Sequence, residues 1–180
     1  MHITKTTPLN QILKLNSLCK QCGNCCRFSS GYVLEQEIKQ IANLLNLNEE
    51  EFKEKYLEET ILFNKPVYRI KTKPSSKPYS ECIFLENNLC KIHKAKPLFC
   101  KIINCSHAPE LLSWYYLNYI LDPKDPFALR EWRIYLHSGG KAIPGGFLFD
   151  FDKKDLKHAF SLSFKEVKTD GKEKNKPKHY

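Results

Sequence analysis

The sequence lacks the features that would place the protein in a membrane or export it. It contains no apolar run near the roughly 18 residues that span a bilayer. The N-terminal segment also lacks the charged start, apolar stretch and small-residue cleavage site of a signal peptide. We therefore expect a cytoplasmic protein with no membrane contact.

Arginine is scarce, with 4 Arg against 25 Lys in a chain of net charge +9. Specific readers of nucleic acids favour Arg, because its planar guanidinium binds phosphates and bases through two parallel hydrogen bonds. Part of the basic excess lies in residues 165–180, which carry six Lys against three acidic residues and which we expect to be disordered. The composition thus argues against a nucleic-acid partner. A zinc module that binds nucleic acid through this tail is a minor alternative.

Cysteine is absent beyond position 105, yet eight cysteines precede that point. Thiols stay reduced in the cytosol, so this number indicates metal ligands and not disulfides. Four of the eight lie within eight residues, where each would need a distant disulfide partner of suitable geometry. We therefore predict metal ligation by Cys19, Cys22, Cys25, Cys26, Cys82, Cys90, Cys100 and Cys105.

The first cysteine segment reads Cys19-Lys-Gln-Cys22-Gly-Asn-Cys25-Cys26. Cysteines two residues apart can direct both thiolates to one ion, and Gly23 lets the backbone approach the metal. Three cysteines at this interval also begin the ferredoxin motif for iron–sulfur clusters, although its continuation to Cys-Pro is absent. Vicinal side chains tend to diverge, so three roles stay open for Cys26: a second site, a bridge, or a free thiol.

The second cysteine segment contains Cys82, Cys90, Cys100 and Cys105. We expect a β-hairpin over 81–92 with an Asn-Asn turn and a cysteine on each arm. A turn at Pro97 would return Cys100 to the same end. Eight thiolates suit either two four-coordinate sites or one site and a spare set. A classical zinc finger is excluded because closely paired histidines are missing.

The remaining pattern predicts an α+β fold: a small, irregular, mostly helical domain with a short β-hairpin, stapled by a cysteine-ligated metal or cluster. Residues 1–164 would form one metal-binding domain, with a cysteine core at 19–105 and a helical extension at 108–160. We expect a loop at 19–31 and strands within 60–73 and 147–151. Helical periodicity and capping residues predict helices at 34–46, 49–59, 109–121, 125–136 and 152–160.

The chain resembles a known family in three segments. These are Cys19-x2-Cys22-Gly-Asn-Cys25-Cys26-Arg27, Cys82-Ile-Phe-Leu85 and Cys90-Lys-Ile-His-Lys-Ala-Lys-Pro97-Leu-Phe-Cys100. They are similar to the YkgJ-type cysteine-cluster proteins of the CxxCxxCC type, and the resemblance covers about half of the chain. The chain departs from the common pattern at His93 and Lys96, where Tyr and Arg are usual. It also departs after Cys100, so Cys105 lies outside the shared part.

The resemblance implies a zinc- or iron-chelating domain and no particular reaction. We expect zinc or iron, the latter as an ion or as an iron–sulfur cluster such as 4Fe-4S, in a structural or redox-active site. Relatives of the domain occur in flagellin lysine methylases. The alternative is therefore an iron–sulfur-dependent protein-modifying enzyme, such as a lysine methylase-like transferase. Against it, the sequence offers no Gly-rich cofactor loop of the G-x-G-x-x-G type.

Overall fold

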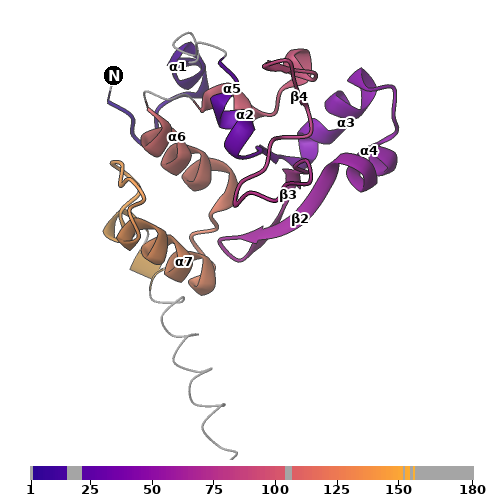
Figure 1. Ribbon diagram of the computed structural model, residues 1–180. Coiled ribbons are helices and arrows are strands. Elements are labelled where there is room, and N and C mark those ends of the chain that lie inside the picture. The colour runs from indigo at the N-terminus through magenta and orange to yellow at the C-terminus, as the bar shows by residue number, and fades with distance from the viewer. Residues whose placement is uncertain (1, 16–21, 104–106, 152, 155, 157–180) are drawn as a thin grey trace, which may run out of the picture.

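Helices and small antiparallel sheets share the chain, which gives a mixed α+β fold (Figure 1). The computed structural model describes residues 2–15, 22–103, 107–151, 153, 154 and 156. The predicted α+β class is confirmed, although about half of the chain and not most of it is helical. In the described ranges no helix has both the length and the apolar character needed to cross a membrane.

The larger sheet has three antiparallel strands in the order β1-β3-β2. The strands are β1 (Tyr32–Val33), β2 (Leu57–Leu62) and β3 (Lys65–Ile70). β2 and β3 form a regular hairpin whose tip, Phe63 and Asn64, has φ values of 50° and 55°. The prediction of strands within 60–73 is confirmed, and β2 begins three residues earlier.

Among the described residues, four helices lie in the first third of the chain. They are α1 (Leu9–Lys14), α2 (Asn24–Phe28), α3 (Glu35–Leu44) and α4 (Glu49–Tyr56). The side chain of Asn48 caps α4 by accepting a hydrogen bond from the Glu51 backbone N–H at 2.9 Å, as an N-cap asparagine should. The predicted helix over 49–59 ends early because the chain enters β2 at Leu57.

The middle of the chain is short and irregular. It contains the two-residue strands β4 (Leu85–Glu86) and β5 (Leu89–Cys90), the 3₁₀ turn η2 (His93–Ala95) and helix α5 (Leu98–Ile102). The Asn87-Asn88 turn has φ values of 48° and 65°. Positive φ at both central residues is the signature of a type I′ hairpin turn, so the predicted turn is confirmed.

The C-terminal part is helical. α6 (Ala108–Tyr115) continues directly into a π-helical turn, η3 (Tyr116–Ile120), and α7 (Pro126–His137) follows. These elements confirm the helices predicted at 109–121 and 125–136, including the Asp125 cap, whose carboxylate accepts from the Phe127 N–H at 2.9 Å. The strand predicted at 147–151 is wrong. There the chain forms a 3₁₀ turn, η4 (Leu148–Asp150), because the Asp150 carboxylate accepts from the Phe147 N–H.

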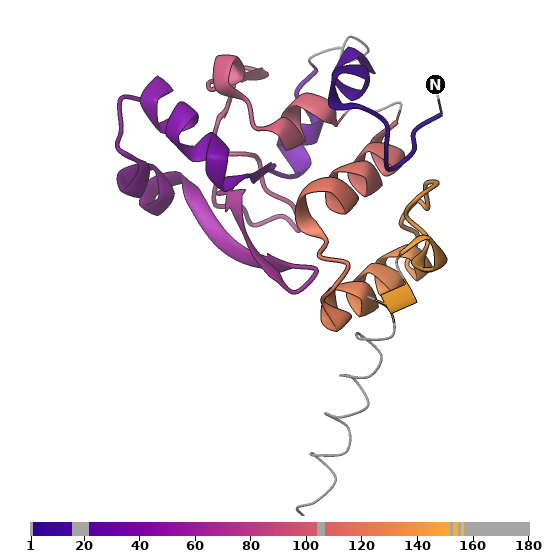
Figure 2. The ribbon, with the colours of Figure 1, turned by 180° about the vertical axis from the view of Figure 1, so that it is seen from behind.

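Two apolar clusters of described residues lie in the interior. One packs α3, α4 and the sheet around Ile38, Phe52 and Ile70, and it includes Cys82. The other joins α1, α5, α6 and α7. Phe63, at the hairpin tip, packs into the second cluster edge-on to Tyr116 and Trp132, so the sheet and the C-terminal helices meet there (Figure 2).

The division into a domain at 1–164 and a tail at 165–180 stays a prediction. The basic tail at 165–180 lies outside the described residues, as does most of the helix predicted at 152–160.

Candidate metal centre

Cys25 and Cys26 lie on α2, which contradicts the predicted loop over 19–31. The helix begins after Gly23, whose φ of 73° is the left-handed conformation that glycine adopts without strain. The Arg27 backbone N–H donates to the Gly23 carbonyl at 3.0 Å and closes the turn. The helix is exposed enough to leave Cys25 accessible, while Cys26 is half-buried.

Cys82 is brought to this helix by the main chain. Its backbone N–H donates to the Cys26 carbonyl oxygen at 2.7 Å, although the two residues are 56 positions apart. Cys82 itself is buried and pairs with Thr72 in an isolated antiparallel bridge. The two cysteine segments thus meet through a direct backbone hydrogen bond.

Cys90 lies on the second arm of the hairpin, opposite Leu85. The expectation of a cysteine on each arm is wrong for Cys82. A turn in which the Leu85 N–H donates to the Cys82 carbonyl at 2.9 Å curls the chain before β4 begins, so Cys82 precedes the strand.

Cys100 lies on α5, which starts directly after Pro97 as the predicted turn requires. Gly31 leaves the space for its sulfur, because a Cβ at position 31 would collide with Cys100 Sγ. The Glu37 carboxylate holds the start of α5 by accepting from the Leu98 N–H at 2.6 Å. Sequence reasoning missed both Gly31 and Glu37. The sequence indicated only that Glu37 would lie in the first turn of a helix.

Cys25 and Cys26 interact directly through their side chains. A hydrogen bond from the Cys26 thiol lowers the pKa of Cys25 to about 6, and the same interaction raises the pKa of Cys26. Cys25 is therefore prepared to act as a thiolate at neutral pH, which is the form that binds metals.

The surroundings of Cys82, Cys90 and Cys100 favour the neutral thiol form. Burial raises the pKa of Cys82, Cys90 and Cys100, and for Cys100 the nearby Cys82 and Cys90 thiols add to the rise. The positive charge of Lys96 lowers the pKa of Cys90 and Cys100, which opposes the effect of burial. A positive charge thus lies near these thiols.

Backbone N–H groups point at two of the sulfurs. Hydrogen bonds from Phe84 to Cys82 and from Ile92 to Cys90 counteract the effect of burial on the two thiol pKa values. In both cases the donor is two residues beyond the cysteine. Donation to sulfur stabilises the thiolate, and such hydrogen bonds surround metal-bound cysteines and iron–sulfur clusters.

Five cysteines are therefore neighbours in space: Cys25, Cys26, Cys82, Cys90 and Cys100. Their thiols influence one another electrostatically. Cys22 is exposed, and all six described cysteines are free thiols. Cys19 and Cys105 lie outside the described residues.

The donor set suits zinc or iron in its chemistry, because thiolates are the soft ligands of zinc and of iron–sulfur clusters. The thiols are gathered without being at coordination geometry. Within the described residues, no group of three or more His, Cys, Asp or Glu side chains is placed so as to hold one ion.

Comparison with known proteins agrees with this chemistry. The model of a family named CxxCxxCC, described as a "Putative zinc- or iron-chelating domain", matches residues 18–118, which is more than half of the chain. The match includes all eight cysteines. No solved structure matches the chain.

Proposed function

The chain belongs to the CxxCxxCC family, and from this premise we propose that it is a metal-chelating protein whose cysteines bind zinc or iron. Iron would be bound as an ion or as a 4Fe-4S cluster. The proposed ligands are drawn from Cys19, Cys22, Cys25, Cys26, Cys82, Cys90, Cys100 and Cys105.

One observation carries the proposal: the 2.7 Å hydrogen bond from the Cys82 N–H to the Cys26 carbonyl. It brings a C-x2-C-x2-C-C segment beside a cysteine that is distant in the sequence. Cysteines that merely filled an apolar core would not need this arrangement, because a core is assembled from any side chains of suitable volume.

A metal here would join short elements that lie far apart in the sequence. α2 and α5 have five residues each, and the strands β4 and β5 have two residues each. Helices this short are unstable alone, and coordination of a structural zinc supplies on the order of 10 kcal/mol toward folding. An iron–sulfur cluster at the same thiolates would supply one-electron redox chemistry.

Anaerobic purification followed by elemental analysis and a visible spectrum tests the proposal. Stoichiometric zinc in a colourless protein, or iron with sulfide-to-iron charge-transfer absorption, would support it and identify the metal. A protein free of both metals after purification and after reconstitution would overturn it.

Single variants show which cysteines matter. We expect Cys25→Ser, Cys82→Ser and Cys100→Ser each to lower the metal content. Lys94→Ser is the matched control, because Lys94 is exposed and lies close to Cys90 without being a candidate ligand. Equal metal content in all four variants would exclude these cysteines as ligands.

A further inference from the structure

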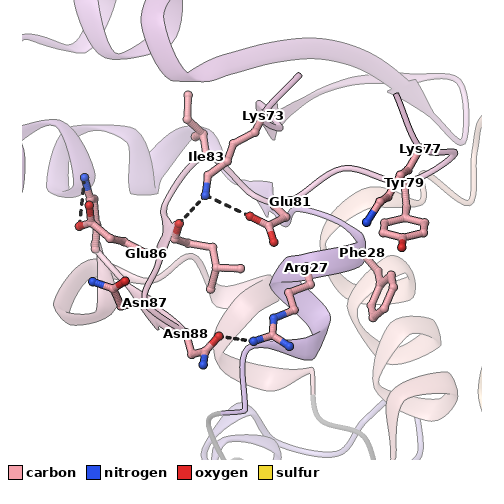
Figure 3. Close-up of a pocket in the computed structure, with 12 residues that line it drawn as sticks. Arg27, Phe28, Lys73, Lys77, Tyr79, Glu81, Ile83, Glu86, Asn87 and Asn88 are labelled. Carbon is pink, nitrogen blue, oxygen red and sulfur yellow. Dashed lines mark hydrogen bonds and ion pairs between the residues drawn. The ribbon is translucent and has the colours of Figure 1, made fainter. Parts of the chain in front are cut away.

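A charged cleft of about 620 Å³ lies beside the cysteine cluster (Figure 3). Its walls are α2, the loop that leads to Cys82, and the tip of the β4–β5 hairpin. The charged residues that line it are Arg27, Lys73, Lys77, Lys91, Glu81 and Glu86. Four cations against two carboxylates give the lining a net charge of +2.

Both carboxylates of the cleft are already neutralised. Lys73 contacts Glu81 at 3.1 Å, and Lys91 contacts Glu86 at 3.2 Å. Arg27 donates instead to the side-chain oxygen of Asn88, and the ammonium group of Lys77 lies 5.5 Å from the ring centre of Tyr79. Within the described residues neither Arg27 nor Lys77 is paired with a carboxylate, so both charges are available to an anion.

Two aromatic rings lie beside these cations. Phe28 is 57% exposed and Tyr79 is 40% exposed, with ring centres 4.9 Å apart. Exposed aromatic rings next to Arg have the composition of binding hot spots in protein–protein interfaces. The lining therefore offers an apolar contact as well as positive charge.

We propose that this cleft binds an acidic segment of a partner protein that carries an apolar or aromatic residue among its carboxylates. The cations Arg27, Lys73 and Lys77 lie apart and have different neighbours (Figure 3), and Lys91 pairs with Glu86. Carboxylates spaced along an extended chain match such a distribution better than a single phosphate does.

The cleft and the cysteine cluster use the same segments. Arg27 follows Cys26, Glu81 and Ile83 flank Cys82, and Lys91 follows Cys90. A partner bound here would lie next to the candidate metal centre. The charge of the cleft comes from side chains that are not candidate metal ligands, so this inference goes beyond the proposed function.

Fluorescence anisotropy with a labelled peptide of alternating glutamate and phenylalanine tests the proposal on the full chain. We expect binding that weakens as salt is added, because screening reduces attraction between exposed charges. Combined Arg27→Glu and Lys77→Glu substitution should weaken it at least about tenfold. Phe28→Ala should weaken it without altering the salt dependence.

The matched control is the pair Arg130→Glu and Lys39→Glu, which changes net charge equally on α7 and α3, outside the cleft. Equal weakening by both pairs would overturn the proposal, because it would show attraction by net charge alone. Tighter binding of a single-stranded oligonucleotide, lost on the same cleft substitutions, would also overturn it in favour of nucleic acid. Metal content, measured on each variant, distinguishes failure of this inference from failure of the proposed function.

Discussion

The carboxylate of Glu37 accepts a hydrogen bond from the backbone N–H of Leu98 at 2.6 Å, across 61 positions of sequence. Its second oxygen accepts from the Leu34 N–H at 2.9 Å, which caps α3. One side chain thus joins the first turns of α3 and α5. Because α5 carries Cys100, Glu37 positions a candidate ligand without contacting a metal.

We predict that Glu37→Gln lowers the free energy of unfolding by about 1–3 kcal/mol, because one buried N–H loses its charged acceptor. Metal affinity should fall with it. Urea unfolding and metal competition measure the two effects. Glu35→Gln is the control on the same helix, since Glu35 is exposed and, among the described residues, pairs only with Lys53 at 3.1 Å. That change should cost less than about 1 kcal/mol. Equal losses in the two variants would refute the positioning role.

Gly31→Ala should disturb the candidate centre directly. The added methyl group would collide with Cys100 Sγ and would lie 3.1 Å from Phe99 Cδ1. Overpacking of this kind typically costs 1–3 kcal/mol, so we expect about that loss of stability together with weaker metal binding.

The double variant Gly31→Ala/Cys100→Ala separates the two effects, and thermal unfolding with metal analysis would measure them. Removal of the sulfur should relieve the collision and restore stability in the metal-free protein, while metal binding stays weak. A double variant as unstable as the sum of the single variants would show that the glycine is needed for another reason.

The features that the sequence predicted correctly depend on local interactions. Asn48 and Asp125 cap helices through backbone N–H groups two or three residues away, and the Asn87-Asn88 turn is fixed by its own φ values. Hydrophobic periodicity likewise predicted α3 and α6 to within a few residues, and the capping residues predicted α7. The cysteine spacing predicted the chemistry of the site for the same reason.

The arrangement of the site was not predictable, because it depends on contacts between distant segments. No pattern in the sequence indicates that the Cys82 N–H donates a hydrogen bond to the Cys26 carbonyl. Nor does any pattern indicate that position 31 must be glycine because Cys100 Sγ lies against it. The prediction of a strand at 147–151 was wrong because a local side-chain hydrogen bond competes with strand pairing. Asp150 accepts from the Phe147 N–H, which favours a turn.

Tyr115 has a fully buried hydroxyl with no hydrogen-bond partner among the described residues. Burial raises the pKa of this hydroxyl. We predict that Tyr115→Phe leaves stability unchanged or raises it by up to about 1 kcal/mol, because the desolvated hydroxyl disappears. Tyr135→Phe is the control, since the Tyr135 hydroxyl lies 3.4 Å from Ser113 Oγ and its loss should destabilise slightly. A large loss in Tyr115→Phe, measured by thermal unfolding, would reveal a partner for the hydroxyl.

Stability should depend on pH with opposite signs in the metal-free and metal-loaded protein. Burial raises the pKa of Cys82, Cys90 and Cys100 above the ordinary value of 9.0, so the metal-free fold favours neutral thiols. The contribution of these three thiols to stability is therefore fully present below pH 9 and is lost as the pH rises above that value. The lowered pKa of Cys25 acts in the opposite direction, because its contribution is present above pH 9 and is lost as the pH falls toward about 6. Metal ligands must instead be thiolates, so protons compete with the metal, and the loaded protein should lose metal and stability as the pH falls.

Thermal unfolding across a pH series, with and without stoichiometric zinc, measures the pH dependence of stability in the metal-loaded and the metal-free protein. Zinc addition in weak buffer should also release protons, because thiols that hold them must give them up on binding. A stabilisation by zinc that stays constant from acidic to alkaline pH would mean that no thiol loses a proton on binding. That result would count against thiolate ligation by the described cysteines.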